Sequence, residues 1–387
     1  MVLLKLFAHI VKTIILTNIF EISLYQIMLG EDMSLATDGR VEKQSGQNRP
    51  VRPTIHTVAQ KAGVSISTVS QVLRGKGRIS DDTRRKVVKV ANEFGYVQDR
   101  RAAAMRSGKS QEVGLLIHNI RNPFNAEVVV GVNSYLEEQG YLVYVLDALD
   151  DPVRQRRYLQ TMLAGSPAGL LWVPSMGTDR ETIDLVLARS STTVSLLRPI
   201  PNHPFDHVGI DSTYGALLAT RHLLDMGHRR LAFLGGDHNS ETIVQRIGGF
   251  ASAMFRVGVK PEIVRSCAET KSAAMEATVD LLTGHPDITG IVCNCDVVAA
   301  GAMLGLSRLG LNVGGDVSVT GFDDIEDARL LSPPLTTVAV DPVGIGRQLA
   351  SVLLERKSMG NSPVRTVNLP IKLVVRESSG PPRTMAK

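Results

Sequence analysis

Two kinds of hydrophobic pattern divide this chain. From residue 113 onward, short apolar runs alternate with amphipathic stretches whose apolar residues recur at helical spacing. The apolar runs predict buried strands at 113–118, 141–147, 168–174, 192–197, 230–235, 289–294 and 316–322. The amphipathic stretches predict helices at 125–139, 152–164, 213–227, 242–257 and 296–309. This alternation is typical of parallel sheets covered by helices, and the strand count favours two such sheets with a ligand at the strands' carboxyl ends, between two lobes.

The segment from Thr54 to Arg74 shows the second pattern, which is typical of two short helices joined by a tight turn. The apolar stripe of the first helix consists of Ile55, Val58, Ala59 and Ala62. Gly63 supplies the positive φ that the end of this helix needs before a sharp change of direction. Ser65 is suited to cap the second helix, whose apolar residues face the first. We predict a helix-turn-helix, although an αα-hairpin inside a larger helical domain has the same pattern.

The outward face of the second helix carries short polar groups. Ser67, Gln71 and Arg74 recur along this face, with Ile66 and Ser70 beside them. A glutamine amide pairs with adenine in two hydrogen bonds, a serine bonds several base edges, and an aliphatic group packs on a thymine methyl. The face therefore predicts contact with the major groove of DNA.

A third helix is predicted to begin at Ser80 and end at Gly95. Ser80 is suited to cap it, and Asp81 and Asp82 lie at its positive end. Its predicted buried stripe consists of Val87, Val90, Ala91 and Phe94. Together the three helices form a small all-α unit.

Charge is unevenly distributed along the chain. The 387 residues carry a net charge of +5 and are 43% hydrophobic, which is enough apolar material for more than one core. Residues 49–109 contain fourteen Lys and Arg against four acidic residues, so this segment is +10 and the remainder is −5. A basic head on an acidic body favours a polyanionic partner for the head.

The N-terminal 53 residues do not fit either pattern. Residues 1–30 are apolar but interrupted by Lys5, Lys12 and Glu21, so no uncharged run is long enough for a membrane span. They fit an interfacial amphipathic helix or, as we favour, a stretch upstream of a translation start at Met28 or Met33. Residues 31–53 have the composition of a disordered tail.

Three cysteines, Cys267, Cys293 and Cys295, are too few and unevenly placed for a disulfide framework. Without a second cysteine pair or nearby histidines, they predict packing or pocket-wall thiols in a reducing cytoplasm. We predict no metal and no cofactor. The GKS at 108–110 is not a phosphate-binding loop, because Ala103 stands where that loop needs glycine.

Several motifs in order resemble the lactose/galactose repressor (LacI/GalR) family over about residues 54–377. They are TIHTVAQKAGVSISTVSQVL, TRRKV…FGY, NPFNAEVVVGV, GHRRLAFLGG, RIGGF, DVSVTGFDD and PPLTTV. The resemblance implies an all-α helix-turn-helix headpiece and an α/β core of two Rossmann-like lobes, similar to a periplasmic binding protein, with three crossovers near residues 210, 341 and 370. The implied domains are an extension at 1–53, a headpiece at 54–98, a hinge helix at 99–110, a core for effector binding and dimerisation at 111–377, and a tail at 378–387.

The resemblance also implies residues for DNA contact. Ile66, Ser67 and Gln71 match base-reading positions, and the exposed Arg74 continues their face. Ser65, Thr68 and Ser70 match polar positions near the phosphates, where contacts position the protein without reading sequence. Met105 matches a hinge residue that wedges into the minor groove. Gln98, Asp99 and Ala103 depart from the family's frequent hinge residues.

For the effector, the resemblance implies a site formed by Asn122, Phe124, Arg198, Arg246, Cys295 and Asp323. Arg246 and Asp323 provide a donor fork and an acceptor for a polyol, a sugar or a small acid; the alternative is that they form a salt bridge to each other across the lobes. Cys295 stands at the family's usual asparagine, and Ala268 at a frequent aromatic. The two arginines leave a small anionic metabolite as an alternative to a sugar-like ligand.

We therefore predict a cytoplasmic, homodimeric repressor that binds a palindromic operator and is switched by a small molecule. One headpiece reads a half-site, so two-fold symmetry matches a palindrome. A solute-binding protein of a transporter shares the core and is the alternative, but it needs an export signal and has no basic head. GxSxG and HExxH motifs are missing, which disfavours an enzyme.

Overall fold

The computed structural model describes residues 53–75, 77–97, 110–190, 192–200, 205–236, 240–359 and 362–383. The chain divides into two compact units, with the boundary between Gln98 and Asp99. The predicted N-terminal extension up to residue 52 lies outside the described residues, as does the predicted hinge segment 99–109 with Met105. No helix of the described ranges has the length and hydropathy needed to cross a membrane.

The first unit contains the helices α2 (Ile55–Ala62), α3 (Ile66–Leu73) and α4 (Asp81–Glu93). Thr54, Ser65 and Ser80 cap them, each through a side-chain oxygen that accepts a hydrogen bond from a backbone amide three residues later. Gly63 has a φ of 64°, the left-handed conformation predicted for the turn after α2. The predicted helix-turn-helix is confirmed.

Small and branched side chains form the core of this unit. The fully buried or nearly buried members are Val58, Ala59, Ala62, Val69, Val72, Val87 and Ala91. The prediction that Phe94 is buried is wrong, because 41% of this residue is exposed. The helix α4 ends at Glu93, so Phe94 occupies the C-cap and its ring lies 5.8 Å from Lys61 Nζ instead of inside the core.

The second unit contains two six-stranded sheets. The first has the order β11-β5-β4-β3-β1-β2 and the second β12-β10-β9-β8-β6-β7. All neighbours are parallel except β10 and β12. The strands are β1 (Glu112–Ile117), β2 (Leu142–Asp147), β3 (Gly169–Trp172), β4 (Thr193–Leu196), β5 (Asp206–Ile210), β6 (Leu231–Leu234), β7 (Ile263–Arg265), β8 (Gly290–Cys293), β9 (Ser318–Asp323), β10 (Thr336–Ala339), β11 (Thr366–Leu369) and β12 (Lys372–Val374).

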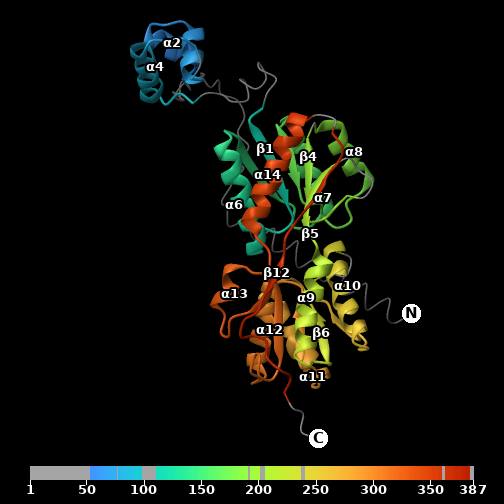
Figure 1. The fold of residues 1–387 in the computed structure, drawn as a ribbon. Helices are drawn as coiled ribbons and strands as arrows, with labels where there is room; N and C mark the ends of the chain where they lie inside the picture. The colour runs from blue at the N-terminus through green and yellow to red at the C-terminus, as the bar shows by residue number, and fades with distance from the viewer. Residues whose placement is uncertain are drawn as a thin grey trace, which may run out of the picture. The chain divides into compact units, whose positions relative to one another are not determined.

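Helices cover both sheets, as predicted for parallel strands (Figure 1). They are α6 (Pro123–Glu138), α7 (Pro152–Ala164), α8 (Arg180–Arg189), α9 (Ser212–Asp225), α10 (Glu241–Arg256), α11 (Lys271–Gly284), α12 (Asp296–Arg308), α13 (Glu326–Leu330) and α14 (Pro342–Met359). Every predicted strand and helix of this unit is present, with ends within two residues of the prediction. The two-sheet α/β architecture is confirmed.

The chain passes between the lobes three times, after β5, after β10 and after β11. These passages lie at the predicted positions near residues 210, 341 and 370. The N-terminal lobe therefore consists of residues 110–210 and 342–369, and the C-terminal lobe of residues 211–341 and 370–383. Parallel strands in both lobes place their carboxyl ends at the junction, which is where an α/β fold binds ligands.

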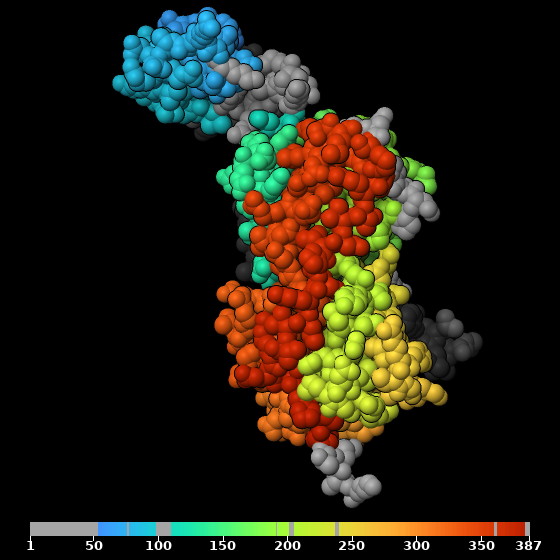
Figure 2. All heavy atoms as spheres, viewed as in Figure 1, coloured from blue at the N-terminus to red at the C-terminus, as the bar shows by residue number. Residues whose placement is uncertain are grey.

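The last described residues pack into the C-terminal lobe. Figure 2 shows this red segment on one face of the lobe, between the yellow-green α9 and the orange helices. Ser378 is fully buried, and its hydroxyl donates to Val319 O at 2.7 Å. Ser318 Oγ donates to Gly380 O at 3.0 Å. Hydrogen bonding to the lobe thus continues past residue 377, where we placed the end of the core.

Two adjacent glycines in α10 meet different surroundings. A Cβ on Gly249 would lie 2.1 Å from Thr213 O of α9, whereas a Cβ on Gly248 has nothing within 4 Å. The glycine at 249 allows α9 and α10 to approach closely. Gly248 has no such role in packing.

We expect Gly249→Ala to lower the free energy of unfolding by about 1–3 kcal/mol, because the helices must separate to admit the methyl group. Gly248→Ala is the matched control and should raise it by about 0.5–1 kcal/mol through helix propensity. Urea denaturation followed by circular dichroism measures both. Equal effects of the two substitutions would contradict the close helix contact.

Candidate functional site

A cavity of about 60 Å³ lies between the two lobes of the second unit. All six residues predicted for the effector site line it. Asn122, Phe124 and Arg198 come from the N-terminal lobe, and Arg246, Cys295 and Asp323 come from the C-terminal lobe. The structure thus brings together side chains that are far apart in the sequence.

Other residues, which we did not predict from the sequence, line the same cavity. They are His118, Asn125, Leu197, Ser240, Thr242, Ile243 and Glu269. His118 directly follows β1, so its place at the carboxyl end of a predicted strand was an available signal. Glu269 follows β7, a three-residue strand that the apolar pattern did not indicate. In the described part of the chain, no three His, Cys, Asp or Glu side chains are grouped to hold a metal ion.

Arg246 projects from α10 and is almost completely buried, with 8% of its side chain exposed. Its guanidinium carbon lies 3.7 Å from the centre of the Phe322 ring, a cation–π contact. Nη1 donates to Asn294 O, and Nη2 lies 4.0 Å from Asp323 Oδ1. Among the described residues, Nε has no hydrogen-bond partner. A buried donor without a partner is costly, so a ligand that accepts this hydrogen bond gains binding free energy.

Asp323 ends β9 with a φ of 120°, in a region that side-chain-bearing residues rarely adopt. Asp323 adopts this conformation at a position where it lines the cavity. Burial raises the pKa of the Asp323 carboxyl well above its usual range, and the nearby Arg246 opposes that rise. The carboxyl therefore offers either an acceptor or, when protonated, a donor to a ligand.

The alternative that Arg246 and Asp323 form a salt bridge across the lobes is wrong in one respect. The two side chains do approach to 4.0 Å, but both belong to the C-terminal lobe, on α10 and β9. Their interaction does not depend on how far the lobes close. Both groups remain at the cavity wall, where a ligand can reach them.

Arg198, in the loop after β4, is bound to a carboxylate of its own lobe. Its Nη1 and Nη2 donate to the two carboxylate oxygens of Asp150 at 2.6 and 3.0 Å, and Nη1 also donates to Pro174 O at 3.0 Å. Asp150 Oδ1 also accepts from the Met176 amide at 2.9 Å. Burial alone would raise the pKa of Asp150, but the hydrogen bonds and charge of Arg198 outweigh it and lower the pKa. This ion pair joins the loops after β2, β3 and β4.

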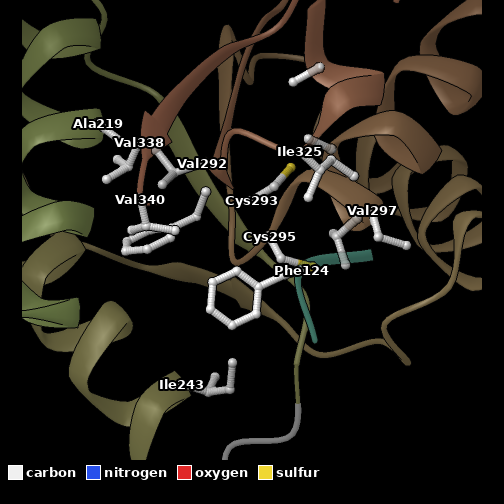
Figure 3. Packing of buried hydrophobic residues seen from close by; sticks show 14 of the residues in the cluster. Phe124, Ala219, Ile243, Val292, Cys293, Cys295, Val297, Ile325, Val338 and Val340 are labelled. Carbon is white, nitrogen blue, oxygen red and sulfur yellow. The ribbon is translucent and has the colours of Figure 1, made fainter. Parts of the chain in front are cut away.

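Apolar groups form one side of the cavity. Figure 3 shows the ring of Phe124, which comes from the start of α6 in the N-terminal lobe, beside Cys295 and near Ile243 of the C-terminal lobe. Asn122 caps α6 by accepting from the Phe124 amide at 3.1 Å, so the cap fixes both predicted residues. Burial raises the pKa of the Cys295 thiol well above its usual range, so it stays neutral. As predicted, Cys293 is a packing thiol and Cys295 a pocket-wall thiol.

The first unit presents a second candidate surface. Ser65, Ile66, Ser67, Gln71 and Arg74 are exposed on or beside α3, while Thr68 and Ser70 are half-buried. Ser65 Oγ lies 2.7 Å from Ser67 Oγ and 2.8 Å from Thr68 Oγ1, so these hydroxyls form one cluster at the start of the helix. Arg74 Nε donates to Ser70 O at 3.0 Å, which turns part of this side chain back onto its own helix.

Asp296, at the start of α12 and next in sequence to the cavity residue Cys295, is buried in the C-terminal lobe. Its Oδ1 accepts from Thr337 Oγ1 at 2.5 Å and its Oδ2 from the Ile325 amide at 3.0 Å. Burial raises its pKa from 3.8 to about 7. The folded state therefore holds a proton that the unfolded state releases between these values, and the free energy of unfolding falls as pH rises through this window.

We expect Asp296→Asn to remove this pH dependence, because an amide cannot titrate and still accepts and donates at the same two partners. The difference in unfolding free energy between the natural protein and the variant should fall from pH 5 to pH 7 and then level off. Urea denaturation at several pH values measures it. A difference that does not change with pH would show that Asp296 is ionised throughout.

Each of the two units matches a protein-family model. Residues 54–99 match "Bacterial regulatory proteins, lacI family", and residues 220–379 match "Periplasmic binding protein-like domain". The maltose regulon regulatory protein MalI of Escherichia coli is 31% identical over 332 residues, covering 83% of this chain and 97% of MalI. The ribose operon repressor of Haemophilus influenzae is 32% identical over 328 residues, covering 84% of this chain and 98% of that repressor.

Solved structures of transcriptional regulators are also similar to this chain. The lac repressor dimer bound to operator and the anti-inducer ONPF matches with a TM-score of 0.76 and 26% identity, over 85% of this chain and 99% of the repressor chain. The complex of the transcriptional regulator CelR with cellobiose matches with a TM-score of 0.65 and 28% identity, over 85% of this chain and 100% of that chain. The chain belongs to the lacI family of bacterial regulatory proteins, and it is a DNA-binding regulator of transcription.

Proposed function

We propose that this protein is a repressor that binds a palindromic operator as a homodimer and is switched by a small molecule held between its lobes. The observation that carries the proposal is the presence in one chain of a helix-turn-helix with an exposed polar face and of a cavity between two lobes with partly unpartnered polar groups. In this proposal α3 reads DNA, and the six predicted cavity residues surround the effector. The protein works in the cytoplasm, where DNA and metabolites are both present.

The DNA contacts divide into two kinds. Ile66, Ser67 and Gln71 read base edges in the major groove, where an aliphatic side chain meets a thymine methyl and an amide pairs with adenine. Ser65, Thr68, Ser70 and Arg74 position the headpiece on the phosphates. Met105 enters the minor groove at the operator centre. The exposure of Ile66, Ser67 and Gln71 supports their access to base edges.

The effector acts by shifting a population of conformations. Its binding changes the angle between the lobes, and the segment at 99–110 then gains or loses helical structure at the DNA. The proposal requires no chemical reaction, and we propose that the protein is not an enzyme. The relatives described above bear the names of regulators, which supports this view.

A homodimer follows from the need to read two half-sites. Exposed apolar side chains on the core support a protein partner: Val130 on α6, Leu304 on α12 and Leu330 on α13 are 58%, 50% and 74% exposed. Figure 1 shows α6 and α13 on the same side of the core. Covering these side chains by a second copy would remove apolar surface from water.

We expect Gln71→Ala to relax base preference at one operator position, at a cost of about 1–3 kcal/mol, because one bidentate base contact is lost. An operator is first selected from random duplexes with the natural protein. Fluorescence anisotropy then measures both proteins on that operator and on its single-base variants. Gln60→Ala, which removes an exposed amide from α2, is the matched control and should leave the preference unchanged. Uniform weakening on all duplexes by the Gln71 variant would contradict base reading.

We expect Arg246→Met to abolish the effector's influence on operator affinity while preserving ligand-free affinity. Methionine keeps apolar contact with Phe322 but removes the donors at the cavity wall. A thermal-shift screen of metabolites on the natural protein identifies an effector, because a ligand of the folded state raises the melting temperature. Operator titrations with and without that compound then compare the variants.

The control for this experiment is Arg256→Met, at the exposed end of the same helix. It should respond to the effector as the natural protein does. If Arg246→Met keeps a normal response, the effector does not bind at this cavity. If the natural protein selects no operator from the random pool, the proposed function itself fails.

A further inference from the structure

Some polar side chains of the cavity have hydrogen-bonding atoms without a partner among the described residues, whereas others are already paired. This difference affects whether the cavity favours a charged or an uncharged ligand. The present inference rests on the proposed function and concerns the same cavity. Arg198 is one of two arginines that line it. Its terminal nitrogens already donate three hydrogen bonds, two of them to a single carboxylate.

The hydrogen bonds of Arg198 have a structural role. Asp150 accepts from Arg198 and from the Met176 amide, and Pro174 O accepts from Arg198, so the pair holds three loops together. Only 13% of the Arg198 side chain and 22% of the Asp150 side chain are exposed. A bidentate guanidinium–carboxylate pair of this kind is strong and neutral as a unit. An anionic ligand would have to compete with Asp150 for the guanidinium.

The remaining charges give an anion no advantage. Besides the Arg198–Asp150 pair, the cavity has one guanidinium, Arg246, and two carboxyl groups, Asp323 and Glu269. When Asp323 is ionised, the set is net negative; when Asp323 holds a proton, the set is neutral. Glu269 Oε1 accepts from Asn294 Nδ2 at 2.7 Å, which holds this acidic side chain at the wall. In neither state does the cavity carry the excess positive charge that a phosphate group requires.

His118 has the opposite character to Arg198. It follows β1 at the carboxyl end of the sheet and lines the cavity from the N-terminal lobe. Its Nδ1 is buried and has no hydrogen-bond partner within the described ranges. Burial and the charge of Arg198 lower the pKa of the imidazole to about 4, so the ring is neutral at cellular pH. A neutral imidazole has one donor and one acceptor nitrogen, which matches a hydroxyl group that does both.

We propose that the cavity selects an uncharged ligand with several hydroxyl groups, and that His118 rather than Arg198 hydrogen-bonds it from the N-terminal lobe. Arg198 is a positioning residue, held by Asp150. On the opposite wall, the unpartnered Arg246 Nε and the Asp323 carboxyl bind further hydroxyls. This ligand is the sugar-like one of the two alternatives that the sequence leaves open.

The ligand's charge is tested with matched pairs of probes on the full-length protein. The probes are D-ribose, D-glucose and D-galactose, each compared with its phosphate monoester. Thermal shift and isothermal titration calorimetry measure binding. We expect at least one uncharged sugar to bind, and its ester to bind at least about tenfold more weakly. Tighter binding of an ester, or no binding by any uncharged sugar, overturns the proposal.

The role of Asp150 is tested by Asp150→Asn, which frees the charge of Arg198. This substitution should move the affinity ratio of sugar to ester by about tenfold or more toward the ester. Asp151→Asn is the matched control, because it removes the same charge from the neighbouring residue. Asp151 caps α7, a role that asparagine also performs, and makes no contact with Arg198 among the described hydrogen bonds and ion pairs. An equal change of the ratio in both variants would show that Asp150 acts only through net charge.

The role of His118 is tested by His118→Phe and His118→Asn with the sugar that binds. We expect phenylalanine to weaken binding by about tenfold or more, and asparagine, which keeps a donor and an acceptor, to weaken it less. One monodeoxy analogue of that sugar should bind the natural protein about tenfold more weakly than the parent sugar does. The same analogue and the parent sugar should bind the His118→Phe variant equally well. A purely structural role would weaken all analogues alike and would overturn the assignment.

Operator binding separates this inference from the proposed function. If the selected operator is bound and released in response to an anionic compound, the protein is a ligand-switched repressor and only the inference fails. If no duplex is selected, the proposed function fails, whatever the cavity binds. Circular dichroism spectra of the His118 and Asp150 variants that match the spectrum of the natural protein show that these variants are folded.

Discussion

The junction between the lobes depends on how buried charge is compensated there. Moving a guanidinium or a carboxylate out of water is costly unless a partner and hydrogen bonds compensate it. The N-terminal lobe compensates the charge of Arg198 through the carboxylate of Asp150 and also supplies a backbone carbonyl acceptor. The C-terminal lobe compensates Arg246 only in part, with a ring, one carbonyl and a carboxyl 4.0 Å away. Because of this asymmetry, the wall of the C-terminal lobe can gain free energy from a ligand that completes the hydrogen bonding of Arg246.

The same asymmetry explains why a site at this junction suits a switch. Each charged pair lies within one lobe, so neither pair fixes the angle between the lobes. A ligand that hydrogen-bonds His118 on one wall and Arg246 on the other would connect the lobes directly. In the proposed function, that connection changes the relative populations of the lobe angles, and its free energy limits how strongly the operator affinity can change.

Much of the fold was predictable because the central strands are buried on both faces and read as continuous apolar runs. The helix caps Ser65 and Ser80 were predictable for a local reason, since a cap acts within one turn. The edge strands β11 and β12 were missed because none of their residues is fully buried. The buried strands β5 and β10 were missed because Asp206, His207 and Thr336 interrupt an apolar run. The partnership of Asp150 with Arg198 was also missed, because hydrogen-bond partners distant in the chain leave no local pattern. Phe94 was placed in the core because spacing alone does not reveal where a helix ends.

The three passages of the chain between the lobes have a consequence for how ligand preference changes in such proteins. Neither lobe is one continuous stretch of sequence, because residues 342–369 complete the first lobe and 370–383 complete the second. A single recombination event inside the core therefore cannot transplant an intact lobe from a relative. Replacements in the loops that follow the strands, at positions such as His118 and Cys295, change the cavity wall while the scaffold is retained.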